Sequence, residues 1–192
     1  MNNKLISKGL VAALVGSLSV PAFAHTGGDS AGLVQGFLHP FTGLDHLLMM
    51  LAVGLIAVRM GGKHLRVLPA VFGGSLLAGA VLGMSGFTLA FVEQGILLSV
   101  VVLGLMLSAV FKFNLAISSV LVASFALLHG GAMGAESAGA MLTTVAGILM
   151  ASGLIQLVGA GLGKVMLNYR FDRLLRTSGG IIALLGVVMS MA

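Results

Sequence analysis

The stretch that decides the fold is His39-Pro40-Phe41-Thr42-Gly43-Leu44-Asp45-His46, which directly precedes an uncharged apolar run over 47–58. A run of this kind is typical of a membrane helix, and its first turn here carries an acid and an imidazole. An Asp at the centre of such a helix costs ~2.5–3.5 kcal/mol on insertion scales, so ionisable groups in membrane spans usually have a function. The stretch therefore predicts a polar site near one face of a membrane.

The composition predicts an integral membrane protein, since 58% of the 192 residues are hydrophobic and only 8% are charged. Soluble domains carry about 25% charged residues. The basic residues lie in short gaps between apolar runs, so they form no soluble patch and nucleic-acid binding is excluded. The chain has no cysteine, which excludes disulfides, thiolate ligands and cysteine nucleophiles. A metal site would have to use His, carboxylate, Met or backbone atoms.

Residues 1–24 have the pattern of a secretory signal peptide. A basic start and an apolar segment over 9–20 precede Ala22-Phe23-Ala24, which fits a small-x-small cleavage site. The alternative is a retained membrane helix. We therefore predict two segments, a cleaved signal peptide over 1–24 and a single membrane domain over 25–192.

Cleavage would make His25 the first residue of the mature chain, outside the cytoplasm. A free α-amine beside an imidazole can chelate a metal ion, and a solvated end without metal is the alternative. Residues 25–37 are Gly-rich and polar and then mildly apolar, so we expect a short external lead-in. Pro40 suits the first turn of a helix, where its missing N–H costs nothing.

Six apolar runs predict an all-α, polytopic membrane bundle of six transmembrane helices. They cover about 40–58, 67–87, 95–111, 114–129, 138–162 and 179–192. Glycines four residues apart, at Gly79 and Gly83 and again at Gly159 and Gly163, have the small-xxx-small spacing that lets helices approach closely.

The basic residues predict the orientation. Every Lys and Arg after residue 24 falls in the loops after the first, third and fifth runs, and positive residues favour the cytoplasmic side. Both ends of the mature chain are therefore expected outside the cytoplasm, and this agrees with a cleaved signal.

A second polar island, from His129 to Glu136, falls at the same outer end in this topology. His46, Asp45, His129, Glu136 and His39 could therefore share one depth and bind a metal ion. On a regular helix His39 and His46 lie two turns and ~10 Å apart, too far for one ion unless the first turn unwinds. Pro40 and Gly43 favour such an irregular start.

Each of these residues also has a structural alternative. Asp45 and His46 could be a buried pair that only locks helix packing, and His39 could be a water-exposed residue at a helix start. Three glycines between His129 and Glu136 suggest broken backbone, which membranes tolerate where it lines a cavity or is buried in protein. The alternative is an external turn with a solvated Glu136.

The two motifs resemble those of the HupE/UreJ family. His39-Pro40, Gly43 and Asp45-His46, followed by Val53-Gly54, resemble the first family signature. His129-Gly130, Ala132, Gly134 and Glu136 are similar to the second, in which a histidine usually stands where this chain has Met133.

The resemblance implies a small permease that imports Ni²⁺ or Co²⁺ across the inner membrane. It implies no tightly bound cofactor and no enzymatic activity, and it implies partnership with hydrogenase or urease maturation. One alternative is a membrane metal-binding or accessory protein without transport. Another is an intramembrane serine protease, because Gly83-Met84-Ser85-Gly86 matches the Gly-x-Ser-Gly of rhomboid proteases.

Overall fold

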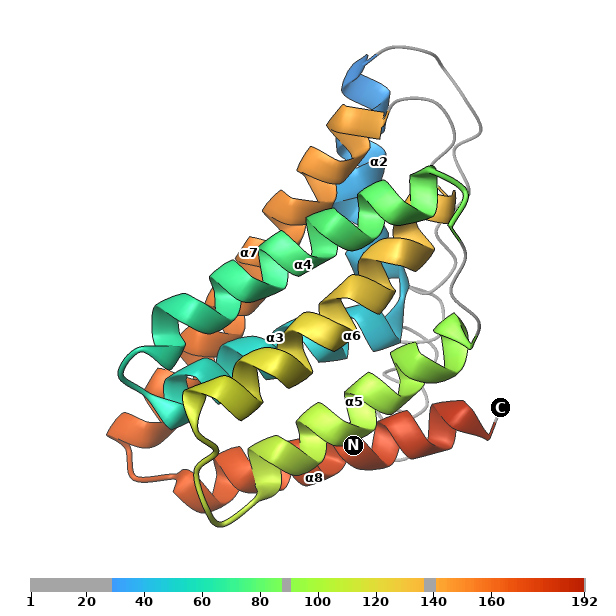
Figure 1. The fold of residues 1–192 in the computed structure, drawn as a ribbon. Helices are drawn as coiled ribbons and strands as arrows, with labels where there is room; N and C mark the ends of the chain where they lie inside the picture. Colours follow the sequence, from blue (N-terminus) through green and yellow to red (C-terminus); the bar gives the residue numbers. More distant parts are fainter. Residues whose placement is uncertain (1–28, 88–90, 137–140, 192) are drawn as a thin grey trace, which may run out of the picture.

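The computed structural model is all-helical, as predicted, and it describes residues 29–87, 91–136 and 141–191. Its helices are α2 (Asp29–Thr42), α3 (Leu44–Met60), α4 (His64–Met84), α5 (Val92–Ser108), α6 (Leu115–Glu136), α7 (Met141–Asn168) and α8 (Asp172–Ser190). The connections between α3 and α4, α5 and α6, and α7 and α8 lie at one end of the molecule (Figure 1). From α3 onward the chain therefore passes back and forth between two ends.

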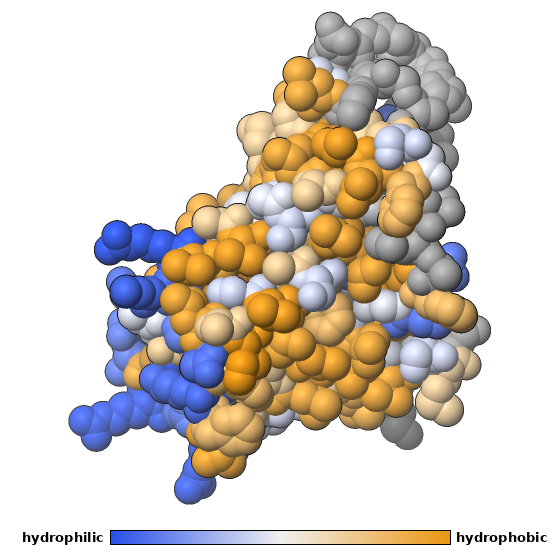
Figure 2. Space-filling view, viewed as in Figure 1, coloured by the Kyte–Doolittle hydropathy of each residue, from blue (hydrophilic) through white to orange (hydrophobic). Residues whose placement is uncertain are grey.

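Three of the described helices, α4, α6 and α7, are long and apolar enough to cross a membrane. The bent pair of α2 and α3 makes a fourth crossing when it is taken as one span, and α5 is apolar but shorter. Apolar side chains cover most of the visible face, and hydrophilic ones gather mainly at the end that carries the three connections (Figure 2).

Helices α4 and α6 pack with their backbones in contact. A Cβ added at Gly79 or Gly83 of α4 would collide with the carbonyl oxygen of Leu127 or Gly131 of α6. In return, a Cβ at Gly130 or Gly134 of α6 would collide with a carbonyl oxygen of α4. The predicted close packing at Gly79 and Gly83 is thus confirmed. Helix α6 contributes two glycines with the same four-residue spacing to this contact.

At the end of the molecule that carries the three connections, two arginines from other helices donate hydrogen bonds to carbonyl groups at the end of α5. Arg59, near the end of α3, donates from its Nη2 to the carbonyl oxygen of Ala109, and Arg176 of α8 donates from its Nε to that of Ser108 at 3.0 Å. A helix C-terminus leaves carbonyls unsatisfied and favours nearby cations. These contacts hold three helix ends at one level.

The predicted start of the first helix at about residue 40, after a short lead-in over 25–37, was wrong. Residues from Asp29 onward form α2, and Pro40 lies near the end of that helix and not in the first turn of a span. The physical reason is close packing, since a Cβ at Gly36 would collide with the backbone of Thr144 in α7. Glycines that indicate a loop by composition serve here as a flat contact surface.

The predicted break between His129 and Glu136 was also wrong. Helix α6 runs without interruption to Glu136, because two of its glycines lie against α4. The basic segment over 164–176 is likewise mostly helical, since α7 continues to Asn168 and α8 begins at Asp172.

We expect Gly79→Ala to destabilise the protein strongly, because the new methyl group meets a backbone carbonyl that cannot move alone. Gly74→Ala, on the same helix with open space at its Cβ, is the matched control and should be neutral or gain up to ~1 kcal/mol from helix propensity. Thermal unfolding of the purified variants in detergent measures both. Equal melting temperatures for the two variants would contradict the backbone contact.

Candidate metal centre

The centre is built at a break in the chain. Helices α2 and α3 meet at 84° across Gly43, whose backbone is extended at φ −103° and ψ 118°. This bend places the ring of His39, near the end of α2, edge to face with the ring of His46 in the first turn of α3, with centroids 5.5 Å apart. The discontinuous backbone that the site needs thus lies at Gly43, not in the second motif.

Gly43 leaves room for a side-chain pair. A Cβ at this position would lie 2.7 Å from Nδ1 of His46 and 2.8 Å from Oδ1 of Asp45. Its φ and ψ are open to any residue, so the requirement for glycine here is space and not conformation. A larger residue would displace both polar groups.

His46 is oriented by the carboxylate beside it. Its Nδ1–H donates to Oδ1 of Asp45 at 3.0 Å. An ionised carboxylate only accepts, so the proton sits on Nδ1 and the lone pair of the neutral ring is on Nε2. That Nε2 atom is buried without a hydrogen-bond partner. Metal-ligating histidines are commonly held by a carboxylate in this way.

His129 of α6 is arranged in the same manner. It is fully buried, its Nδ1–H donates to the carbonyl oxygen of Phe125 at 2.9 Å, and its Nε2 has no hydrogen-bond partner. Its ring lies edge to face with that of His46, with centroids 5.0 Å apart. Two imidazoles from helices distant in sequence therefore meet, each with an anchored Nδ1 and an unpartnered Nε2.

The donor set converges but does not form a closed cage. Within the described residues, no group of three or more His, Asp or Glu side chains is placed to hold a metal ion. The ring of His46 contacts those of His39 and His129 edge to face, so side chains or helices must shift before the ring nitrogens can share one ion. Neutral imidazole nitrogens and a carboxylate suit Ni²⁺ and similar divalent ions.

The other predicted site residues lie further off or outside the described part. Helix α6 ends at Glu136, two turns or about 10 Å along the axis from His129. His25 falls outside the described residues. Met133 is buried one turn beyond His129, so the position where the family usually has a histidine belongs to the same interior.

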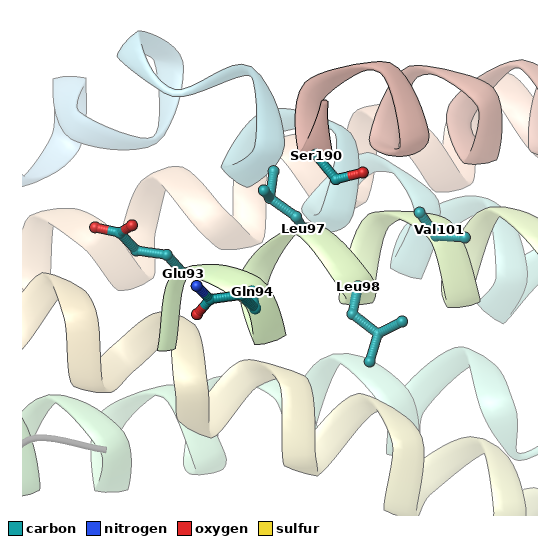
Figure 3. Close-up of a pocket in the computed structure, with 6 residues that line it drawn as sticks. All are labelled: Glu93, Gln94, Leu97, Leu98, Val101 and Ser190. Carbon is teal, nitrogen blue, oxygen red and sulfur yellow. The ribbon is translucent and has the colours of Figure 1, made fainter. Parts of the chain in front are cut away.

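A cavity of about 320 Å³ lies elsewhere, between α5 and the end of α8. Glu93, Gln94, Leu97, Leu98 and Val101 line it from α5, with Ser190 from α8 (Figure 3). It contains no histidine and its lining is mostly apolar. The cavity is therefore not part of the candidate metal centre.

Comparison with known proteins identifies the family. Residues 12–189 match the family model described as HupE / UreJ protein. The chain belongs to the HupE/UreJ family. Protein HupE of Rhizobium leguminosarum bv. viciae is 36% identical over 177 residues, which cover 90% of this chain and 93% of that relative. No solved structure matches.

Family membership confirms the resemblance that the two motifs predict. As a HupE/UreJ protein the chain is a multi-pass membrane protein and a transporter, not an enzyme. The protease alternative is therefore excluded. In agreement, Ser85 is exposed at the end of α4 and its hydroxyl donates to the carbonyl oxygen of Leu82 at 2.7 Å.

We expect His46→Ala and His129→Ala each to weaken equilibrium Ni²⁺ binding by at least about tenfold in detergent, measured by equilibrium dialysis. His64→Ala is the matched control. Its ring also has Nδ1 at a carbonyl oxygen, that of Gly61, at 3.1 Å, and a buried Nε2 without a partner, but it begins α4 at the opposite end. If His64→Ala loses Ni²⁺ binding while His46→Ala and His129→Ala keep it, the metal binds at the opposite end of the bundle and the assignment is wrong.

Proposed function

We propose that this protein imports Ni²⁺ or Co²⁺ across the bacterial inner membrane through an outward-facing site. His46, His129 and Asp45 form its core, and His39 lies beside them. The observation that carries the proposal is the pair of buried imidazoles whose Nε2 atoms have no hydrogen-bond partner. The association of the HupE/UreJ family with nickel or cobalt uptake supports the identity of the cargo.

A role in packing alone accounts poorly for this pair. A buried polar atom without a partner costs about 1–3 kcal/mol, and two such atoms belong to rings whose centroids are 5.0 Å apart. Apolar side chains of similar size would fill the space without that cost. A metal ion uses both lone pairs, and the hydrogen bonds at the two Nδ1 atoms fix the tautomer that a ligand needs.

The charge distribution supports inward transport. All Lys and Arg residues of the described part lie in the connections from α3 to α4, α5 to α6 and α7 to α8, or in the helix ends beside them. Positive residues favour the cytoplasm, so six crossings would put the imidazoles and the C-terminus outside. A membrane potential that is negative inside favours cation entry by ~2.3 kcal/mol per charge per 100 mV.

The proposed route begins with His25 or His39, which collects the hydrated ion outside. His46 and His129 then replace part of its water shell, with Asp45 or Glu136 supplying negative charge. The ion continues inward along the bundle toward a hydrogenase or urease maturation system. No tightly bound cofactor is required.

We expect His46→Ala and Asp45→Ala to abolish Ni²⁺ and Co²⁺ uptake into proteoliposomes with an imposed negative-inside potential. Both variants should still insert into the membrane, because only the polar site is removed. His64→Ala should keep uptake near the wild-type rate. Wild-type protein that binds the ions without carrying them across would instead support the alternative of a metal-binding accessory protein.

We expect Met133→His to raise Ni²⁺ affinity or uptake, since it adds an imidazole one turn from His129 in the buried interior. Parallel uptake and binding curves for wild type and variant measure the gain. Met133→Leu, which keeps a similar volume without a nitrogen, is the control and should behave as wild type. No difference between the His and Leu variants would show that position 133 does not contact the ion.

A further inference from the structure

Apart from the histidines, one uncharged side chain in the described core has a buried acceptor without a partner. The buried serines Ser99, Ser118 and Ser152 all donate to carbonyl oxygens of their own helices or caps. Gln156 of α7 is only 4% exposed, and its Oε1 is buried with no hydrogen-bond partner. A buried acceptor left without a donor is unusual in a native core and needs an explanation.

Gln156 lies inward of the candidate metal centre. A Cβ at Gly54 of α3 would collide with the carbonyl oxygen of Gln156, so the two residues are at one level. Gly54 follows His46 by eight residues, which is about 12 Å along a helix.

One face of α3 connects the two levels. His46, Met50 and Gly54 are spaced four residues apart, so they share this face. Met50 is fully buried, and its position along α3 is midway between His46 and Gly54. The same face thus runs from the unpartnered Nε2 of His46 to the helix that carries the unpartnered Oε1.

We propose that the amide oxygen of Gln156 is a second coordination point for the transported divalent cation. This inference rests on the proposed transport function and adds a site inward of the imidazoles. The ion passes from His46 and His129 along the face of α3 and is held briefly by Oε1, with its remaining water.

The chemistry of an amide suits a transient contact. Its oxygen is a neutral donor that binds a divalent ion more weakly than imidazole or carboxylate does. Conduction requires sites that bind well enough to admit an ion and weakly enough to release it. A carboxylate at this place would hold the ion more tightly and slow its exit.

The first test is Gln156→Leu in purified full-length protein. We expect initial Ni²⁺ uptake into proteoliposomes to fall by at least about tenfold, while Ni²⁺ affinity in detergent stays within about twofold because the imidazoles remain. Ser152→Ala is the matched control. It lies one turn away on α7, its hydroxyl is bonded within the helix at 2.7 Å, and both measurements should stay near wild type.

The second test is Gln156→Glu, which we expect to raise equilibrium Ni²⁺ affinity by about tenfold and to slow uptake. A residue that only packs the bundle gives no gain in binding. Unchanged uptake in Gln156→Leu would overturn the proposal. So would a variant that loses Ni²⁺ binding and uptake together and also melts at a lower temperature, because Gln156 would then only stabilise the fold. If the wild type binds Ni²⁺ but does not carry it across the membrane, the proposed transport function is wrong. The second site is then decided by whether Gln156→Glu raises the Ni²⁺ affinity.

Discussion

The break at Gly43 is the constraint on which the candidate site depends. A continuous helix would hold His39 and His46 about 10 Å apart along its axis. The 84° bend between α2 and α3 brings their rings to 5.5 Å. The hydrogen-bonded pair of Asp45 and His46 occupies the space that a side chain at Gly43 would need. The absence of a side chain at Gly43 therefore leaves room, at the bend between α2 and α3, for the hydrogen bond that orients His46.

The second imidazole is positioned by backbone packing. Gly79 of α4 lies against the segment of α6 between Leu127 and Gly131, which contains His129. Because these contacts join backbone to backbone, the depth of His129 in the bundle is set by α4 and not by flexible side chains. The glycines of the second motif thus fix the position of His129, whereas the sequence suggested that they interrupt the helix.

The sequence predicted the helical class, the membrane setting and the family, because hydropathy and the two motifs are local signals. It also predicted that Gly79 and Gly83 pack closely. It failed for Gly36 and for the glycines after His129, since composition cannot distinguish a glycine in a loop from one against another helix. That distinction depends on the partner, such as Thr144 for Gly36, which the local pattern does not reveal. The sequence does mark Gln156 as the one amide in a long apolar run. Only the structure shows that its Oε1 is buried without a hydrogen-bond partner.

Among the described residues the donor set is incomplete, which would suit the proposed role of a site that releases its ion. A closed cage of ligands would bind tightly and hold its cargo, whereas conduction needs sites that also let go. His46 and His129 keep their Nδ1 atoms anchored, so neither ring can turn freely toward an ion. If the two Nε2 atoms bind one ion, as proposed, they would be brought together mainly by movement of α3 against α6. Helix α6 is held against α4 by glycine contacts, and α3 is held against α7 in the same way at Gly54 and Gly159, so such a movement would shift two closely packed helix pairs against each other.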